Sequence, residues 1–405
     1  MTTPLARNRN YTLLWSGQAL AEVGFSATMI AFPLLVLAVT GSPVAAGLVL
    51  SADATAQLLA GLPAGALVDR WDRRKIMLAC EAAQVLALGG LVVAIWLDTA
   101  TVAHMVAVAA VLGVCRALFE PAEDACLPKL VPDEQLATAV AMNSARSSLG
   151  QMAGTALGGA LFAVTRWLPF LVDLLTHCAA FLALLFLRVP PSPRGPSAER
   201  HFLREIGEGL RWVWRHREVR ATAACAVVLN LFFTAFYVVV IVLAEQRGVA
   251  KAEIGVMAAM LGVGGVLGAL AAPRLHRVLG PHKSIAAVFW AVTLLTPLAA
   301  PVHDGYLLGA LFAGMAFLAP TANTTISTHQ LLLTPDQLRG RLSGVLAVVV
   351  GTAGAAGPLV GGALTQLLPA HQAVLVCAAG IALVTAFVTV SPTLRRYAER
   401  KEETA

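Results

Sequence analysis

Long apolar stretches, separated by short charged or Gly/Pro-rich segments, dominate the chain. Most of them are about 20–28 residues long, and a helix needs about 20 residues to cross the hydrocarbon core of a bilayer. They are too long for transmembrane strands, which argues against a β-barrel. The pattern predicts an all-α membrane protein with twelve transmembrane helices, at 11–39, 44–68, 76–97, 103–127, 137–163, 168–188, 219–246, 254–275, 284–301, 305–330, 341–367 and 372–391.

The composition narrows the possible classes of protein further. Of 405 residues, 58% are hydrophobic and 13% are charged, whereas soluble domains carry about 25% charged residues. An ordinary soluble enzyme and a disordered chain are therefore both disfavoured. The sequence has no P-loop, no nucleophile motif and no metal-ligand spacing among its nine His. We expect no enzyme activity, no cofactor and no metal.

The distribution of Lys and Arg predicts the orientation in the membrane. The segment 1–10 carries two Arg, and no small-residue cleavage site follows it, so we interpret the next run as a membrane helix rather than a signal peptide. Of the 29 Lys and Arg, 24 fall on the side of the N-terminus, three on the other side and two within spans. The positive-inside rule then places both termini in the cytoplasm. This bias also accounts for the net charge of +6, so no nucleic-acid partner is expected.

The longest polar interruption divides the chain into two halves. It opens with four prolines and continues as a basic amphipathic stretch, typical of a helix on the membrane surface or of a solvated linker helix. The predicted parts are an N-terminal six-helix bundle at 1–188, a linker at 189–218, a C-terminal six-helix bundle at 219–391 and a cytoplasmic tail at 392–405.

An internal repeat relates the two halves. Gly65-Ala66-Leu67 recurs as Gly268-Ala269-Leu270, Gly158-Gly159 recurs as Gly361-Gly362, and Pro132-Asp133 recurs as Pro335-Asp336. Every pair is separated by 203 residues, about half the chain length. The repeat predicts two pseudo-symmetric bundles of parallel topology.

The turn between the second and third spans carries the most specific motif. It reads Gly65-Ala66-Leu67-Val68-Asp69-Arg70-Trp71-Asp72-Arg73-Arg74. This string resembles the G-x-L-x-D-R-x-G-R-R signature of the major facilitator superfamily, with Asp72 in place of the usual Gly. A plain positive-inside loop would explain the Arg residues but not Gly65, Leu67 and Asp69 together. The resemblance implies that Gly65, Asp69, Arg70, Arg73 and Arg74 form a conformational latch.

Glycines recur at helical spacing in the fifth and eleventh spans. Such small residues let helix backbones pack closely, and Pro358 removes one helix hydrogen bond. The motif comprises Gly154 and Gly158 in the fifth span and Gly354, Gly357, Pro358 and Gly361 in the eleventh. It resembles the G-x-x-x-G-P-x-x-G-G pattern of superfamily exporters, which usually lies in the fifth helix.

Further strings resemble the bacterial macrolide-efflux and enterobactin-exporter branch. They are Phe119-Glu120-Pro121-Ala122, Leu127-Pro128, Asn143-Ser144, Asp173 and Glu208-Gly209-Leu210-Arg211. The resemblance implies proton antiport that exports an amphipathic small molecule, such as a drug or a siderophore-like compound, across the bacterial inner membrane. The expected partners are a small-molecule substrate, protons and the lipid bilayer, and we expect a monomer. The alternative is a proton-coupled importer or exchanger of a small metabolite.

Ionisable residues within spans are costly and therefore mark candidate functional sites. Glu22, near mid-depth, is the leading proton acceptor, because a carboxyl group out of water takes up a proton more readily. Asp53 is the second candidate, and Arg116 or Arg146 could be the counter-charge of the accepting carboxylate in one conformation and leave it in the other. Glu120 and Asp124 follow Arg116 at steps of four residues, a pattern that also fits structural ion pairs near a cytoplasmic gate. Asp173 and His177 are interpreted as an interface pair.

The C-terminal half has no acid deep within a predicted span. This asymmetry suggests proton coupling in the N-terminal half and a largely apolar substrate wall toward the C-terminal half. The candidates for the substrate cavity are Phe25, Phe32, Asn230, Phe236, Tyr237, Met260 and Asn323. Each of them is also compatible with ordinary packing.

Overall fold

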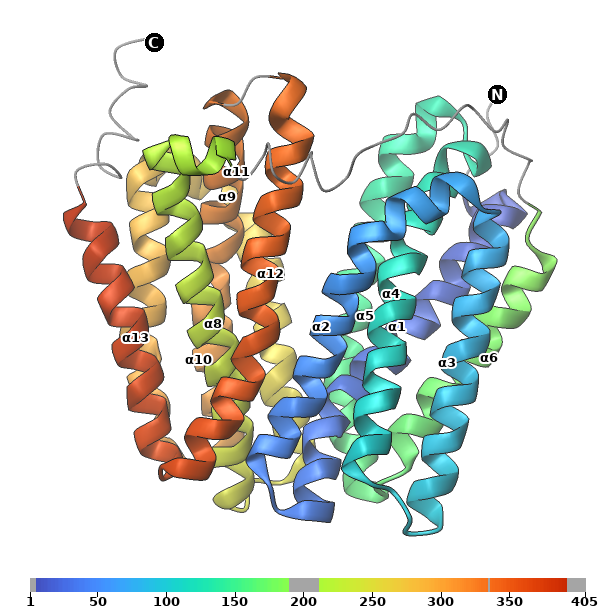
Figure 1. Ribbon diagram of the computed structural model, residues 1–405, viewed down its shortest axis with the longest axis horizontal. Helices are drawn as coiled ribbons and strands as arrows, with labels where there is room; N and C mark the ends of the chain where they lie inside the picture. Colours follow the sequence, from blue (N-terminus) through green and yellow to red (C-terminus); the bar gives the residue numbers. More distant parts are fainter. Residues whose placement is uncertain (1–4, 189–210, 334–335, 392–405) are drawn as a thin grey trace. The chain divides into compact units, whose positions relative to one another are not determined.

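The N-terminal half of the computed structural model consists of six long helices (Figure 1). The structure describes residues 5–188, 211–333 and 336–391, and it contains no strand within these ranges. A short 3-10 helix, Leu5–Arg7, precedes the first helix. The six helices are α1 (Arg9–Thr40), α2 (Pro43–Arg70), α3 (Arg73–Trp96), α4 (Val102–Leu130), α5 (Asp133–Val164) and α6 (Leu168–Phe186).

The C-terminal half departs from the predicted spans at two places. Its helices are α8 (Arg217–Gln246), α9 (Lys251–Leu295), α10 (Gly305–Phe317), α11 (Ala319–Leu333), α12 (Asp336–Leu367) and α13 (Ala370–Val390). The backbone of α9 stays helical across the expected break at 276–283, because a Gly-Pro pair removes only one hydrogen bond and bends a helix more readily than it ends one. The predicted span 305–330 is divided at Leu318, since Pro320 cannot donate a backbone hydrogen bond to the preceding turn.

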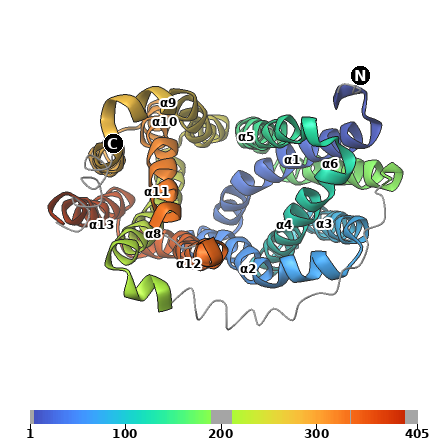
Figure 2. The same cartoon turned by 90° about the horizontal axis from the view of Figure 1, so that it is seen from above.

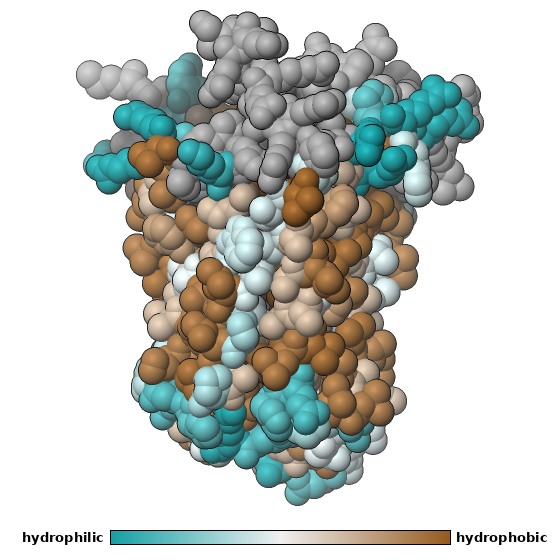
Figure 3. Space-filling view, turned by 90° about the vertical axis from the view of Figure 1, so that its left-hand side faces the viewer, coloured by the Kyte–Doolittle hydropathy of each residue, from teal (hydrophilic) through white to brown (hydrophobic). Residues whose placement is uncertain are grey.

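Ten helical segments among the described residues are long and apolar enough to cross a membrane, and one of them, Gly305–Ile326, runs through α10 and α11. On the face drawn in Figure 3, hydrophobic residues cover the middle and hydrophilic residues gather toward the ends. The chain is therefore a multi-pass membrane protein, and the count of twelve spans stays a prediction. Helix α5 is not among the ten, and it carries Asn143, Ser144, Arg146 and Ser147.

The helices are divided between two compact units. The first comprises Met1–Gly41, Leu48–Ala198 and Ala250–Ala259, and the second comprises Ser42–Gly47, Glu199–Val249 and Met260–Ala405. In the first unit, α1 packs mainly against α5 and α6, and α3 packs against α4 and α6 (Figure 2). In the second unit, α8 packs mainly against α12 and α13. The predicted linker 189–218 lies mostly outside the described residues, and the tail 392–405 lies wholly outside them.

Glycines bring corresponding pairs of helices into close contact in the two units. A Cβ atom placed on Gly158 of α5 would lie 2.5 Å from the Ala27 carbonyl oxygen of α1. A Cβ on Gly361 of α12 would likewise meet the carbonyl oxygen of Ala235 in α8. These two glycines are 203 residues apart, so the sequence repeat recurs as the same helix crossing.

Candidate functional site

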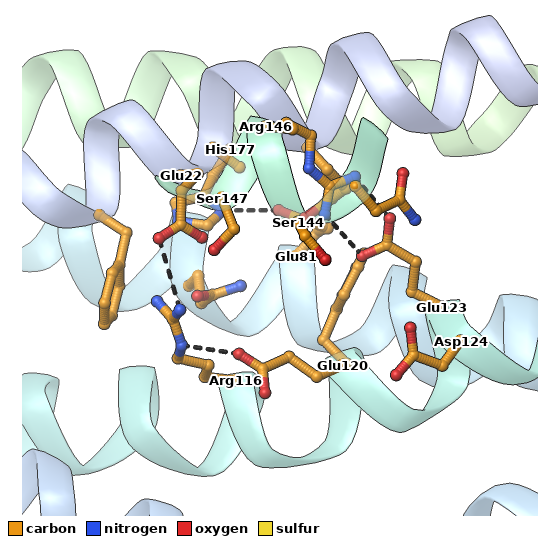
Figure 4. Close-up of a pocket in the computed structure, with 16 residues that line it drawn as sticks. Glu22, Glu81, Arg116, Glu120, Glu123, Asp124, Ser144, Arg146, Ser147 and His177 are labelled. Atoms are coloured by element: carbon orange, nitrogen blue, oxygen red, sulfur yellow. Dashed lines mark hydrogen bonds and ion pairs between the residues drawn. The ribbon is translucent and has the colours of Figure 1, made fainter. Parts of the chain in front are cut away.

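A cavity of about 370 Å³ lies inside the first unit, between α1, α3, α4, α5 and α6 (Figure 4). All five helices are long, so their mid-regions hold the lining side chains on rigid backbone. The lining consists of Gln18, Ala21, Glu22, Phe25, Glu81, Gln84, Arg116, Phe119, Glu120, Glu123, Asp124, Asn143, Ser144, Arg146, Ser147 and His177. Five of these residues are acids and two are arginines, so the cavity has a surplus of negative charge.

Arg116 connects two of the predicted acids. Its Nη2 atom lies 3.4 Å from Glu22 Oε1, and its Nε atom donates a hydrogen bond of 2.9 Å to Glu120 Oε1. The guanidinium also lies 4.5 Å from the centre of the Phe25 ring, within the range of a cation–π interaction. The predicted i,i+4 pair of Arg116 with Glu120 is thus present, and Glu22 joins it from α1.

Arg146 forms a second, more buried ion pair. Its two terminal nitrogens contact the two carboxylate oxygens of Glu123 at 2.6 and 3.0 Å. The Arg146 and Glu123 side chains are only 10% and 7% exposed. This two-bond geometry holds α5 against α4 beside the cavity.

A buried cluster without arginine lies on the α3 and α6 side of the cavity. His177 Nδ1 lies 2.6 Å from Glu81 Oε2, and Gln18 Nε2 donates a hydrogen bond of 2.9 Å to Glu81 Oε1. On the other side of the imidazole, Nε2 lies 3.3 Å from Asp173 Oδ1. The predicted interface pair of Asp173 with His177 is therefore part of a larger group that includes Glu81.

The other predicted charged residues take different positions. Asp124 lines the cavity and is exposed. Asp53 of α2 does not line it, although the Asp53 carboxylate interacts electrostatically with Arg116. Its Oδ1 atom is buried and has no hydrogen-bond partner among the described residues.

The predicted substrate-wall residues are not gathered at this cavity. Phe25 lines it, whereas Phe32 is fully buried and packs edge-on against Phe170, with 5.2 Å between ring centres. In the second unit, Phe236 and Tyr237 both pack against Phe312. Of the remaining candidates, Asn230 donates a hydrogen bond to the Ala226 carbonyl. Met260 is half-buried and Asn323 is exposed.

The turn motif forms contacts inside the first unit. The Asp72 carboxylate accepts hydrogen bonds from the backbone of Arg74 and Lys75 and so caps the N-terminus of α3. This explains how Asp serves at a position where Gly is usual. The Arg74 side chain donates to the Leu184 and Leu185 carbonyls in the last turn of α6.

The remaining latch candidates differ in their surroundings. Arg73 donates a hydrogen bond of 2.7 Å to the Ala125 carbonyl in α4. Gly65, Asp69 and Arg70 are exposed, and a Cβ on Gly65 would meet no atom within 4 Å. The structure thus supplies packing partners for Arg73 and Arg74, while the latch role of the whole motif stays a prediction.

Sequence reasoning missed Glu81 altogether and gave Glu123 no role. Glu81 is an acid near the start of an apolar span, which is a signal that the sequence does carry. Its importance depends on contacts with Gln18 and His177, which lie 63 and 96 residues away along the chain. No local spacing rule reveals such contacts.

Residues 2–404, nearly the whole chain, match the family described as transmembrane secretion effector. This is a family of the major facilitator superfamily. The chain belongs to this family. It is accordingly a membrane transporter of small molecules, and its helices follow the major facilitator fold.

Characterised relatives and solved structures agree with this assignment. The chain is 27% identical over 392 residues to the multidrug efflux pump Tap of Mycolicibacterium fortuitum, covering 93% of this chain and 94% of Tap. It is 29% identical over 212 residues to macrolide efflux protein A of Streptococcus pyogenes, covering 49% of this chain and 50% of that protein. The crystal structure of a mutant of the nucleoside transporter NupG has a TM-score of 0.79 at 11% identity, over 94% of this chain and 98% of NupG, and therefore supports the fold alone.

Proposed function

We propose that the chain is a secondary active exporter of lipophilic or amphipathic small molecules, driven by proton antiport. The full-length similarity to a multidrug efflux pump supports export and the substrate class. In this proposal two pseudo-symmetric halves alternate access to the two sides of the bacterial inner membrane. The protein acts as a monomer, both termini face the cytoplasm, and the latch and glycine motifs serve the conformational change.

The observation that carries the proton assignment is the position of Glu22. It lines the cavity at mid-helix in α1, and its counter-charge Arg116 is shared with Glu120. A shared and partly exposed guanidinium can leave one acid without leaving the other, so Glu22 can alternate between a paired carboxylate and a protonated carboxyl group. Substrate and proton then compete for one site. Asp53, Asp124 and Arg146 are secondary members of the same network.

One observation favours the alternative of a proton-coupled importer or exchanger of a small metabolite. The cavity carries many neutral hydrogen-bonding side chains besides its charges: Gln18, Gln84, Asn143, Ser144 and Ser147. A site of this kind suits a polar solute better than a purely lipophilic one.

Proteoliposomes with an acidic lumen test the proposal directly. Ethidium serves as the lipophilic fluorescent cation, and a trapped dye reports the internal pH. Wild-type protein is expected to take up ethidium while protons leave, and the Glu22→Gln variant is expected to lose at least 90% of both fluxes. The reason is that an amide cannot release the exchanged proton.

Glu134→Gln is the matched control, because Glu134 is an exposed acid in the first turn of α5 and lies outside the cavity. It should retain wild-type fluxes. Ethidium movement that ignores the pH gradient in the wild type would refute proton antiport. Absence of ethidium movement, together with gradient-driven uptake of a polar metabolite such as a nucleoside, would favour the alternative.

A further inference from the structure

The cluster of Glu81, His177 and Asp173 has features that a structural interface pair does not require. All three residues are buried, with exposed fractions of 1%, 4% and 0%. Glu81 and His177 line the cavity, whereas Asp173 lies behind them and does not. The imidazole therefore bridges a carboxylate at the cavity wall and a carboxylate sealed inside the helix bundle.

Helix α1 seals the inner end of this cluster. A Cβ atom placed on Gly24 would lie 2.6 Å from Asp173 Oδ1 and 2.8 Å from Asp173 Cα, so the backbone of α1 covers the carboxylate directly. Neither oxygen of Asp173 has a hydrogen-bond partner among the described residues. The contact to His177 Nε2 at 3.3 Å meets the distance of an ion pair but not the geometry of a hydrogen bond.

Charge balance distinguishes this cluster from the other acids of the cavity. Glu22 and Glu120 contact Arg116, and Glu123 contacts Arg146, whereas the charged groups that act on His177 are Asp173 and Glu81. An imidazolium between two carboxylates leaves one negative charge buried, which is costly. The cluster becomes neutral when a further proton resides on one carboxyl group.

Within the described ranges, His177 is the ion-pair partner of Glu81 and Asp173, and neither acid pairs with Lys or Arg. Gln18 of α1 donates to Glu81, and the Cys80 thiol on α3 lies within electrostatic range of Glu81. From α3, α4 and α5, the further polar or charged groups of the cavity are Gln84, Arg116, Glu120, Glu123, Asp124, Asn143, Ser144, Arg146 and Ser147. No group of three or more His, Cys, Asp or Glu in the described part of the chain has the arrangement of a metal site. A proton is the ligand that two carboxylates and an imidazole can share directly.

We propose that Glu81, His177 and Asp173 form a second proton-binding site, separate from the Glu22–Arg116 pair and loaded from the cavity. Glu81 takes a proton from cavity water. The Nε2–H bond of the imidazolium breaks as an O–H bond forms at Asp173 Oδ1, after a small rotation of the ring brings the two atoms, 3.3 Å apart, into line. The net result is one proton taken from the cavity and one passed from the imidazolium to the buried carboxylate, so the cluster ends neutral, with a neutral imidazole between two carboxyl groups. Its use in transport rests on the proposed function, whereas its existence does not.

Infrared difference spectroscopy between pH 5 and pH 9 tests the site without any transport. Purified protein in nanodiscs is expected to show the carbonyl stretch of a buried carboxylic acid that titrates. Asp173→Asn should remove one component of this band, and the same component should remain in Glu22→Gln and Glu134→Gln. A titrating band that is the same in Asp173→Asn as in the wild type, or a wild-type protein without such a band, would overturn the proposal.

Nitrogen-15 NMR of labelled histidine provides a second readout if Asp173→Asn does not fold. The His177 signal, assigned by its loss in His177→Gln, is expected to change tautomer or charge over the same pH range and to shift in Glu81→Gln. An invariant His177 signal would contradict the site. In proteoliposomes, Asp173→Asn should lower the number of protons exchanged per ethidium by one and retain dye transport. If the spectroscopic result holds while wild-type ethidium transport fails, the proposed function is wrong and the proton site stands.

Discussion

At the scale of single residues, two arginines form ion pairs with three of the five acids that line the cavity. Arg116 contacts Glu22 and Glu120, and Arg146 is committed to Glu123 through two short hydrogen bonds. The contact between Arg116 and Glu120 follows from a four-residue spacing on one helix. The contact between Arg116 and Glu22 joins residues 94 positions apart. Only the packing of α1 against α4 brings these two together.

The Arg146–Glu123 pair predicts a specific loss of stability. Glu123→Gln leaves Arg146 buried without a counter-charge, which should lower the free energy of unfolding by about 3–5 kcal/mol. The double variant Glu123→Gln/Arg146→Met should recover at least half of that loss, because it buries no unpaired charge. Thermal unfolding in detergent measures both effects. The exposed neighbour Asp124 is the control, and Asp124→Asn should unfold at the wild-type temperature; an equal loss there would mean that pairing is not the cause.

At the scale of helices, glycine placement decides where backbones touch. Gly158 and Gly361 lie at corresponding positions of the repeat and face α1 and α8. The glycine spacing was visible in the sequence, but which glycines contact a neighbouring helix was not. Gly354 belongs to the same motif as Gly357, yet a Cβ there would meet nothing within 4 Å.

This contrast within α12 predicts opposite effects of the same substitution. A Cβ on Gly357 would meet the Thr234 hydroxyl and lie 2.6 Å from the Leu231 carbonyl oxygen. Gly357→Ala should therefore destabilise the protein by about 1–3 kcal/mol through overpacking. Gly354→Ala should be neutral or stabilise it by up to about 1 kcal/mol, because Ala favours helix. Thermal midpoints in detergent compare the two variants, and equal midpoints would show that α8 and α12 do not pack as described.

At the scale of the whole molecule, membrane insertion follows from hydropathy and orientation follows from charge. Ten helical segments of the described residues are long and apolar enough to span a bilayer, and the Lys and Arg bias of 24 to three predicts the side on which each loop lies. Thr99 precedes α4 and Glu134 follows it, so the two positions mark opposite ends of one membrane helix.

Labelling with a membrane-impermeant maleimide tests this orientation in intact cells. Thr99→Cys should be labelled from outside, and Glu134→Cys should be labelled only after the membrane is permeabilised. Both positions are exposed. Five of the six native cysteines are buried and Cys178 is half-buried, so the background should be low. The reverse pattern of labelling would show that the proposed topology is wrong and that the termini face the outside.

The sequence alone determined the class of the protein, because apolar length, charge bias and the turn motif are local or additive properties of the chain. It also located Glu22, Arg116, Glu120 and Arg146, since ionisable side chains are conspicuous within apolar spans. Tertiary structure decided which acids share an arginine and which share a histidine. It also placed Glu81, Asp173 and His177 in one buried cluster. Ion-pair partners are chosen by distances of a few ångströms between helices, and those distances depend on packing across the whole bundle.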